Sequence, residues 1–67
     1  MTLTIVFKQE FESDMRKQFG SFANPLRIYG VKQVYEKDGL LHSVILDDRA
    51  FRMSDISQIY VEDGGDE

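Results

Sequence analysis

The stretch that decides the fold runs from residue 26 to residue 61 and reads LRIYGVKQVYEKDGLLHSVILDDRAFRMSDISQIYV. Its centre is the dipeptide Asp38-Gly39, which lies between two runs rich in β-branched and aromatic residues. Asp-Gly suits a two-residue type I′ turn, because both central residues of that turn need positive φ. The sequence therefore predicts a β-hairpin whose tip is formed by residues 38 and 39.

The turn fixes the register of the two strands and divides their residues between two faces. On one face the register places Val31, Gln33, Tyr35 and Lys37 opposite Leu46, Val44, His42 and Leu40. On the other face it places Lys32, Val34 and Glu36 opposite Ile45, Ser43 and Leu41. The first face is the more apolar, so we expect it to line the core.

The second face is still too apolar to be fully hydrated, because it carries Val34, Leu41 and Ile45. Contiguous exposed apolar patches often mark interaction sites. We therefore expect either a helix or a protein partner to cover this face, and we take these three residues as the candidate partner interface.

The remainder of the stretch predicts a bend, a second turn and a closing strand. Gly30 separates two apolar sets of opposite parity, and a bulge there would return both sets to the core. Residues 47–50 favour a turn, residues 51–53 a short strand, residues 54–57 a helical turn capped by Ser54 and residues 59–61 a final strand. This order is typical of small SH3-like and Sm-like barrels, a fold analogy that carries no function.

In the residues before this stretch, the spacing of apolar side chains changes from that of a strand to that of a helix. Residues 2–8 alternate between apolar and polar side chains, as in a half-buried strand. Apolar residues then recur at helical spacing from Phe11 to Phe22, with acids early, bases late and Gly20 following. These features predict a helix over residues 10–19. An alternative continues the strand through Phe11 and leaves a short helix capped by Ser13.

The sequence thus predicts one α+β domain over residues 1–61, with one amphipathic helix and a twisted antiparallel β-meander. A meander of this length can also curl into a small, partly open SH3-like or Sm-like barrel. Residues 62–67 contain four acids and no base, and we expect them to form an acidic, disordered tail. The predicted core comprises Leu3, Ile5, Phe7, Phe11, Met15, Phe19, Leu26, Ile28, Val31, Leu40, Val44, Leu46, Phe51, Ile56 and Ile59.

Length and composition exclude several classes of protein. A chain of 67 residues buries only about 60% of its unfolded surface, so its stability is marginal. The absence of cysteine and the single histidine exclude disulfides, thiolate metal sites and most zinc sites. Self-association is the remaining stabilising device, so we expect a homodimer. We also expect no membrane partner and a cytoplasmic location, because no apolar run reaches about 20 residues and the start lacks a basic signal region.

Charge argues against nucleic acid as the first partner. The net charge of −4 is located in the tail, since the other eight acids balance the eight bases. A neutral body lacks the basic excess that drives phosphate binding. Basic and aromatic residues nevertheless alternate along one stretch of the sequence. Aromatic side chains can stack on the nucleobases of a single strand. The alternative hypothesis is therefore a small barrel that binds single-stranded nucleic acid through Arg27, Tyr29, Lys32 and Lys37.

The residues that could support catalysis or metal binding form no recognisable motif. His42 and Ser43 are adjacent in a strand and point to opposite faces, so they cannot form a base and nucleophile pair. We expect His42 to be a half-exposed residue stacked near Tyr35. Asp47, Asp48 and Asp55 lack the spacing of an EF-hand, and aspartate is common in turns. We expect no enzyme, no cofactor and no metal, and an active site or metal site on these acids with His42 is the least favoured hypothesis.

The first functional expectation is a non-enzymatic, homodimeric protein-binding module that acts as an adaptor, regulator or inhibitor. Its support is the lack of a catalytic pair, the second apolar face and the acidic tail. Short, acidic, cysteine-free chains are common among accessory proteins of phages and mobile elements, and this base rate suggests the same class here.

Overall fold

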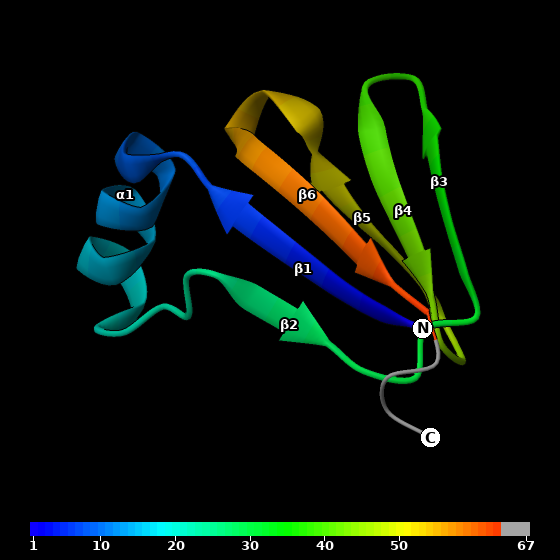
Figure 1. The fold of residues 1–67 in the computed structure, drawn as a ribbon. Coiled ribbons are helices and arrows are strands. Elements are labelled where there is room, and N and C mark those ends of the chain that lie inside the picture. Colours follow the sequence, from blue (N-terminus) through cyan, green and yellow to red (C-terminus); the bar gives the residue numbers. More distant parts are fainter. Residues whose placement is uncertain (64–67) are drawn as a thin grey trace.

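The computed structural model describes residues 1–63 and contains one α-helix and two three-stranded antiparallel sheets (Figure 1). One sheet has the strand order β2-β1-β6 and the other has the order β3-β4-β5. The predicted α+β class is therefore confirmed, and within residues 1–63 the two ladders do not join into a closed barrel. The elements are β1 (Thr2–Phe7), α1 (Gln9–Phe19), β2 (Leu26–Ile28), β3 (Gln33–Lys37), β4 (Leu40–Val44), β5 (Asp48–Arg52), the 3-10 helix η1 (Met53–Asp55) and β6 (Ile56–Glu62).

The central hairpin has the predicted turn and register. Asp38 and Gly39 have φ values of 52° and 75°, the positive values that a type I′ turn requires. Every paired residue of β3 and β4 matches the prediction, from Gln33 opposite Val44 to Lys37 opposite Leu40. The second turn occupies residues 45–47, so β5 begins at Asp48, earlier than predicted.

Gly30 marks the point at which the chain leaves one sheet and enters the other. We predicted a bulge within one strand, and instead β2 pairs with β1 while β3 pairs with β4. Gly30 has a φ of 70°, which side chains disfavour and glycine accepts. Just beyond it, the Val31 N–H donates to the Met1 carbonyl at 2.8 Å, and the Met1 amine donates to the Val31 carbonyl at 2.9 Å.

The prediction of which hairpin face lines the core is wrong. Leu41 is only 4% exposed, and Val34 and Ile45 pack against the same core. The buried face is therefore the less apolar of the two, so composition alone does not decide which face of the hairpin is buried. The covering layer is the other sheet, whose residues Leu3 and Ile5 are fully buried.

The remaining core predictions are confirmed for most residues. Phe7, Val31 and Ile56 are buried beside Leu3 and Ile5, and Phe11, Leu26, Ile28, Phe51 and Ile59 pack against them partly buried. Phe19 and Leu46 were predicted to be core residues, and this is wrong, because they are 70% and 86% exposed. Phe19 lies in the last turn of α1, and Leu46 lies in the turn between β4 and β5. Met15, Leu40 and Val44 are half-buried.

The helix begins one residue earlier than predicted and ends at Phe19, so the alternative with a longer first strand is wrong. Gly20 closes it with a φ of 82°, and its N–H donates to the Arg16 carbonyl. Figure 1 places α1 at the end of the molecule where β1 ends, opposite the N-terminus. Phe11 joins Phe7 and Phe22 there, with ring centroids 5.1–5.5 Å apart. An aromatic cluster therefore anchors the helix, which has no fully buried residue.

The last elements follow the predicted order with shifted bounds. The helical turn is η1 at residues 53–55, and no side chain caps it, so the predicted Ser54 cap is wrong. Strand β6 runs to Glu62, the first residue of the predicted tail. Residues 64–67, which hold most of that tail, lie outside the described part of the chain.

Candidate functional site

The outer face of the β3-β4-β5 sheet carries the one polar cluster that joins an aromatic ring, an imidazole and a carboxylate among the described residues. The registers place Tyr35, His42 and Ala50 in one row across the sheet, and Val44 and Asp48 in the next. The rings of Tyr35 and His42 are stacked, with centroids 4.6 Å apart and an interplanar angle of 1°. The predicted stacking of His42 on Tyr35 is therefore confirmed, although on the outer face and not in the core.

Asp48 accepts hydrogen bonds from both rings. The Tyr35 hydroxyl donates to Asp48 Oδ2 at 2.9 Å, and His42 Nδ1 lies 2.9 Å from Asp48 Oδ1. An ionised carboxylate can only accept hydrogen bonds, so Nδ1 of His42 carries the proton. In the neutral imidazole, Nε2 is then the acceptor nitrogen.

These contacts shift the pKa values of the two acidic groups in opposite directions. Hydrogen bonds from His42 and then Tyr35 lower the pKa of Asp48, because they stabilise its ionised form. The hydrogen bond to Asp48, reinforced by desolvation and by the negative charge of Asp48, raises the pKa of Tyr35. The cluster therefore favours a charged Asp48 beside a protonated Tyr35.

The cluster supplies only part of the chemistry that the enzyme hypothesis needs. An aspartate that orients a histidine supplies two members of a catalytic triad, and the nucleophile is the third. Ser43, the hydroxyl nearest in sequence, is fully buried on the opposite face of the sheet. Asp48 meets His42, but within residues 1–63 no group of three His, Asp or Glu side chains could hold a metal ion.

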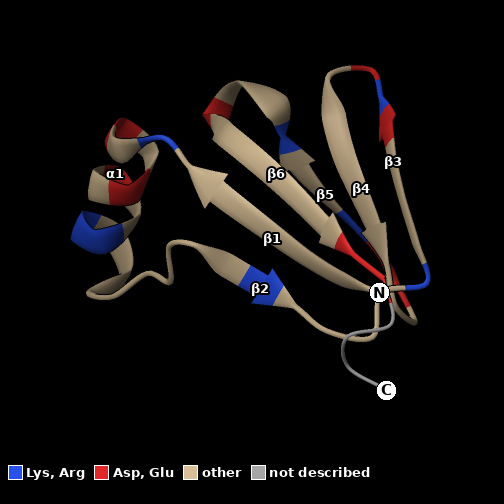
Figure 2. Cartoon of the chain, in the orientation of Figure 1, with Lys and Arg blue, Asp and Glu red and all other residues tan. Residues whose placement is uncertain are grey.

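The four residues of the candidate nucleic-acid face do not form one basic surface. Arg27 lies in β2, Tyr29 and Lys32 lie in the connector around Gly30, and Lys37 ends β3 in the other sheet. Figure 2 shows acidic and basic residues interspersed over the helix and both sheets. The chain's change of sheet at Gly30 therefore separates Lys37 from Arg27 and Tyr29, with which it shares a parity in the sequence.

Strand β6 is an edge strand with little to block its free side. It pairs with β1 alone among the described strands, and all of its residues except Ile56 and Ile59 are exposed. Natural edge strands are usually short, charged or bulged, because unpaired N–H and C=O groups invite further strands. β6 has seven residues and one charge, Glu62 at its end; Figure 2 shows most of the strand in the colour of uncharged residues.

The other three edge strands are protected in these usual ways. β2 has only three residues and contains Arg27. β3 ends in Glu36 and Lys37. Three of the five residues of β5 are charged: Asp48, Arg49 and Arg52. β6 is therefore the edge among these four that is best suited to accept another strand.

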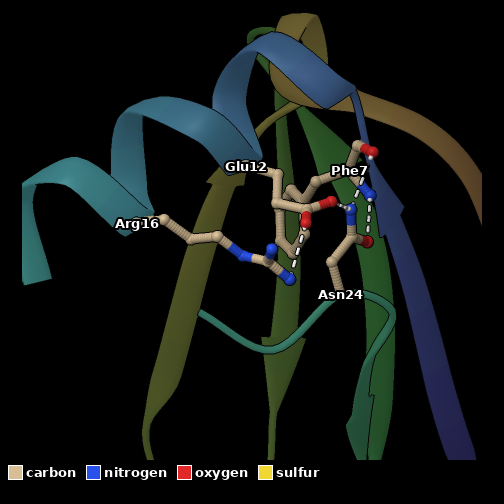
Figure 3. Close-up of polar contacts among 4 residues, drawn as sticks. All are labelled: Phe7, Glu12, Arg16 and Asn24. Atoms are coloured by element: carbon tan, nitrogen blue, oxygen red, sulfur yellow. Dashed lines mark hydrogen bonds and ion pairs between the residues drawn. The ribbon is translucent and has the colours of Figure 1, made fainter. Parts of the chain in front are cut away.

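Asn24 covers the exposed end of β1 that β2 leaves unpaired. Its Oδ1 accepts a hydrogen bond from the Phe7 N–H at 3.0 Å, and its Nδ2 donates to the Phe7 carbonyl at 3.2 Å (Figure 3). Nδ2 also donates to Glu12 at 2.7 Å, and Glu12 forms an ion pair of 2.8 Å with Arg16. Beyond the start of β2, the edge of β1 is thus closed by the side chain of Asn24.

The free part of β6 is its second half. The β1–β6 register shifts between Val6 and Phe7, since Val6 opposes Gln58 and Phe7 opposes Ile56. Ser57 is therefore an extra residue, which forms a bulge at the start of the strand. The regular part begins at Gln58 and includes Tyr60 and Val61, which are 50% and 49% exposed.

Comparisons of the chain with protein-family models, with curated proteins and with solved structures found no match. In the part of the chain that the structure describes, α1 is too short and too polar to cross a membrane. Sequence reasoning did not identify β6 as a site. Its uncharged run from Ser57 to Val61 was visible in the sequence, but its position at a sheet edge was not.

Proposed function

We propose that this protein is a non-enzymatic protein-binding module, an adaptor, regulator or inhibitor, that binds its partner along the free edge of β6. The observation that carries the proposal is the unblocked second half of β6, from Gln58 to Glu62, in a domain whose other edge strands are short or charged. An extended segment that pairs with such an edge gains main-chain hydrogen bonds.

Side chains of β6 supply the specificity that backbone pairing lacks. Alternate residues of a strand project to opposite faces. Ile59 and Val61 share the parity of the core residues Ile5 and Leu3, while Tyr60 shares the outer parity of Thr4. A shallow groove beside β6 on this outer face is lined by Thr4, Val6 and Arg27 together with Tyr60. A partner strand would therefore meet an apolar surface on one face and a polar, aromatic surface on the other.

This proposal moves the interface away from Val34, Leu41 and Ile45. Leu41 is buried in the core and Val34 and Ile45 pack against it partly buried, so these side chains stabilise the domain and offer little open surface. We still expect a protein partner, and we propose that it binds at β6.

Retention of partner proteins from an extract of the source cells tests the proposal. Wild type is compared with Val61→Lys, which puts a charge on the edge, and with Leu46→Lys, which changes an equally apolar, 86% exposed residue away from β6. Circular dichroism confirms that all three are folded. We expect proteins retained by wild type and Leu46→Lys to be reduced about tenfold by Val61→Lys, a change of about 1.4 kcal/mol. Identical retention by all three variants contradicts the proposal.

The second candidate function is binding of single-stranded nucleic acid on the outer face of β3-β4-β5. The observation in its favour is the parallel stack of Tyr35 and His42, with Lys37 and Arg52 in the adjacent row of the same face. Aromatic side chains can stack on the bases of a single strand, and basic side chains on the same face can bind its phosphates. Fluorescence anisotropy with a labelled oligonucleotide at low salt tests it, and binding that is lost in Tyr35→Ala would support it. The absence of salt-sensitive binding contradicts it.

A further inference from the structure

We infer that the partner of β6 is the β6 strand of a second copy of this chain, paired antiparallel about a two-fold axis at Tyr60. The inference rests on the function proposed above and names its partner. The two β2-β1-β6 sheets would join into one continuous sheet, in which each β1 and each β6 has a neighbour on both sides. A two-fold interface uses the same patch on both subunits, so the patch must be complementary to itself.

The composition of β6 makes it complementary to itself. Its residues from Ile56 to Val61 carry no charge, so two copies can lie side by side without opposing like charges. The β5 and β3 edges carry Arg49, Arg52, Glu36 and Lys37, which would have to be matched in any self-pairing. Like charges directly opposite each other across two strands are destabilising.

The charge at the end of β6 selects the antiparallel direction. Glu62 ends the strand and Asp63 follows it. Parallel pairing in register would set Glu62 against Glu62 and Asp63 against Asp63 of the second copy. Antiparallel pairing separates these acids and places them at opposite ends of the shared strand pair.

The bulge at Ser57 selects the register. It interrupts the regular strand at its start, so the part free to pair runs from Gln58 to Glu62 and has Tyr60 as its middle residue. Pairing centred there sets Ile59 opposite Val61 of the second copy, which are aliphatic β-branched residues on the same face. It sets Tyr60 against Tyr60 on the outer face and Gln58 against Glu62. Apolar and aromatic cross-strand pairs of this kind stabilise sheets.

The interface is small, so the dimer should depend on concentration. Pairing would cover Tyr60 and Val61, which are half-exposed in the single chain, together with the unpaired backbone groups of β6. Stable interfaces bury about 1,600 Å² in total, and weak or transient ones bury less. We therefore expect the solution mass to rise from 7.8 kDa toward twice that value as the protein is concentrated.

A cysteine scan tests both the pairing and its register, because the chain contains no cysteine of its own. The variants Gln58→Cys, Tyr60→Cys and Glu62→Cys share one face of β6, and Leu46→Cys is the exposed control. About the proposed axis, the two cysteines of a Tyr60→Cys dimer lie opposite each other. This variant should therefore form a disulfide-linked dimer without a second variant. Two Gln58→Cys residues would lie about 13 Å apart, beyond the reach of a disulfide. Gln58→Cys and Glu62→Cys should crosslink only when the two variants are mixed.

The expected result is crosslinking of Tyr60→Cys, and of the mixed pair, about tenfold faster than that of Leu46→Cys. Crosslinking of all three β6 variants alone would mean parallel pairing and overturn the inference. Crosslinking at the rate of the control for every variant, with a monomeric mass at all concentrations, would also overturn it. The proposed function is tested independently of the dimer by the extract experiment. That experiment asks whether Val61→Lys loses the proteins that wild type and Leu46→Lys retain.

Discussion

The side-chain amide of Asn24 binds the backbone of Phe7 as a neighbouring strand would, accepting from its N–H at 3.0 Å and donating to its carbonyl at 3.2 Å. Strand β2 begins only at Leu26, so these two backbone groups would otherwise lack a strand partner on that side. One residue from the connector thereby completes the pairing of β1 and links it to Glu12 of α1.

Removal of this amide should destabilise the domain measurably. We expect Asn24→Ala to lower the free energy of unfolding by about 1–3 kcal/mol, because it leaves partly buried backbone groups without partners. Asn24→Asp should cost at least as much, since it loses the donor and sets a carboxylate beside Glu12. Urea unfolding measures both, with Gln18→Ala as the control because Gln18 is an exposed amide on α1. Equal stability of Asn24→Ala and Gln18→Ala would show that the bridge contributes nothing.

Leu41 should be essential for folding, whereas Leu46 should not. Leu41 is 4% exposed and Leu46 is 86% exposed, so the same substitution tests opposite environments. We expect Leu41→Asp to unfold the protein, because a buried leucine contributes about 2–5 kcal/mol and a small domain has little more in total. Leu46→Asp should keep the wild-type circular dichroism spectrum and melting temperature. A folded Leu41→Asp would mean that this face of the hairpin is open.

Ser43 should be one of the few core positions where a smaller, less polar residue stabilises the protein. Its side chain is fully buried, and within the described residues its hydroxyl has no hydrogen-bond partner. An unsatisfied buried polar group costs about 1–3 kcal/mol. We expect Ser43→Ala to raise the melting temperature by several degrees, measured by calorimetry against the exposed control Ser21→Ala. A lower melting temperature would indicate that the hydroxyl is satisfied in solution.

The hydrogen bonds to Asp48 should make stability depend on pH in the acidic range. Its pKa is lowered in the folded protein by His42 and Tyr35. A lowered pKa stabilises the folded state above the unfolded-state pKa, and this contribution is lost as the pH falls through the folded-state pKa. Wild type should therefore have a higher melting temperature than Asp48→Asn near pH 7. The difference should shrink once the pH falls below the ordinary aspartate pKa and through the lowered pKa of Asp48 in the folded protein.

The control for this pH profile is Asp47→Asn, because the structure shows no hydrogen bond from Asp47 to either ring. Its melting temperature should differ little from that of wild type at each pH. A constant difference between wild type and Asp48→Asn from pH 7 to pH 3 would contradict the linkage.

The sequence predicts local pairing well because local pairing has a local cause. A two-residue turn at Asp38-Gly39 permits one register, and five of the seven predicted pairs are found, from Gln33 opposite Val44 to Lys37 opposite Leu40. Helix α1 is equally local, since its apolar spacing and Gly20 define both ends. The buried face of the hairpin is a tertiary property, because it depends on where β1 lies. Val31 shows this directly: it is buried, yet it precedes β3, so its parity says nothing about the strand that follows.

The candidate sites were predicted only in part, for the same reason. The contact of His42 with Tyr35 follows from the hairpin register, whereas the contact with Asp48 depends on β5 starting at Asp48, earlier than the sequence predicted. Arg27, Tyr29 and Lys37 share a parity in the sequence, but the chain moves to the other sheet at Gly30 and so separates Lys37 from the other two. The edge position of β6 depends on its pairing with β1, which joins the first and last strands of the described residues.

That pairing has a consequence for the order in which the protein can fold as it emerges from a ribosome. The β3-β4-β5 meander is contiguous in sequence and can assemble early, whereas Ile5 must wait for Ile59, which is synthesised after that meander. Contacts between residues distant in sequence form late and slowly. The nascent chain would therefore expose the apolar side of β1 until β6 has been synthesised. We expect φ-values near zero at Ile59 and higher ones at Leu41, and the reverse order would place the folding nucleus in the β1–β6 pair.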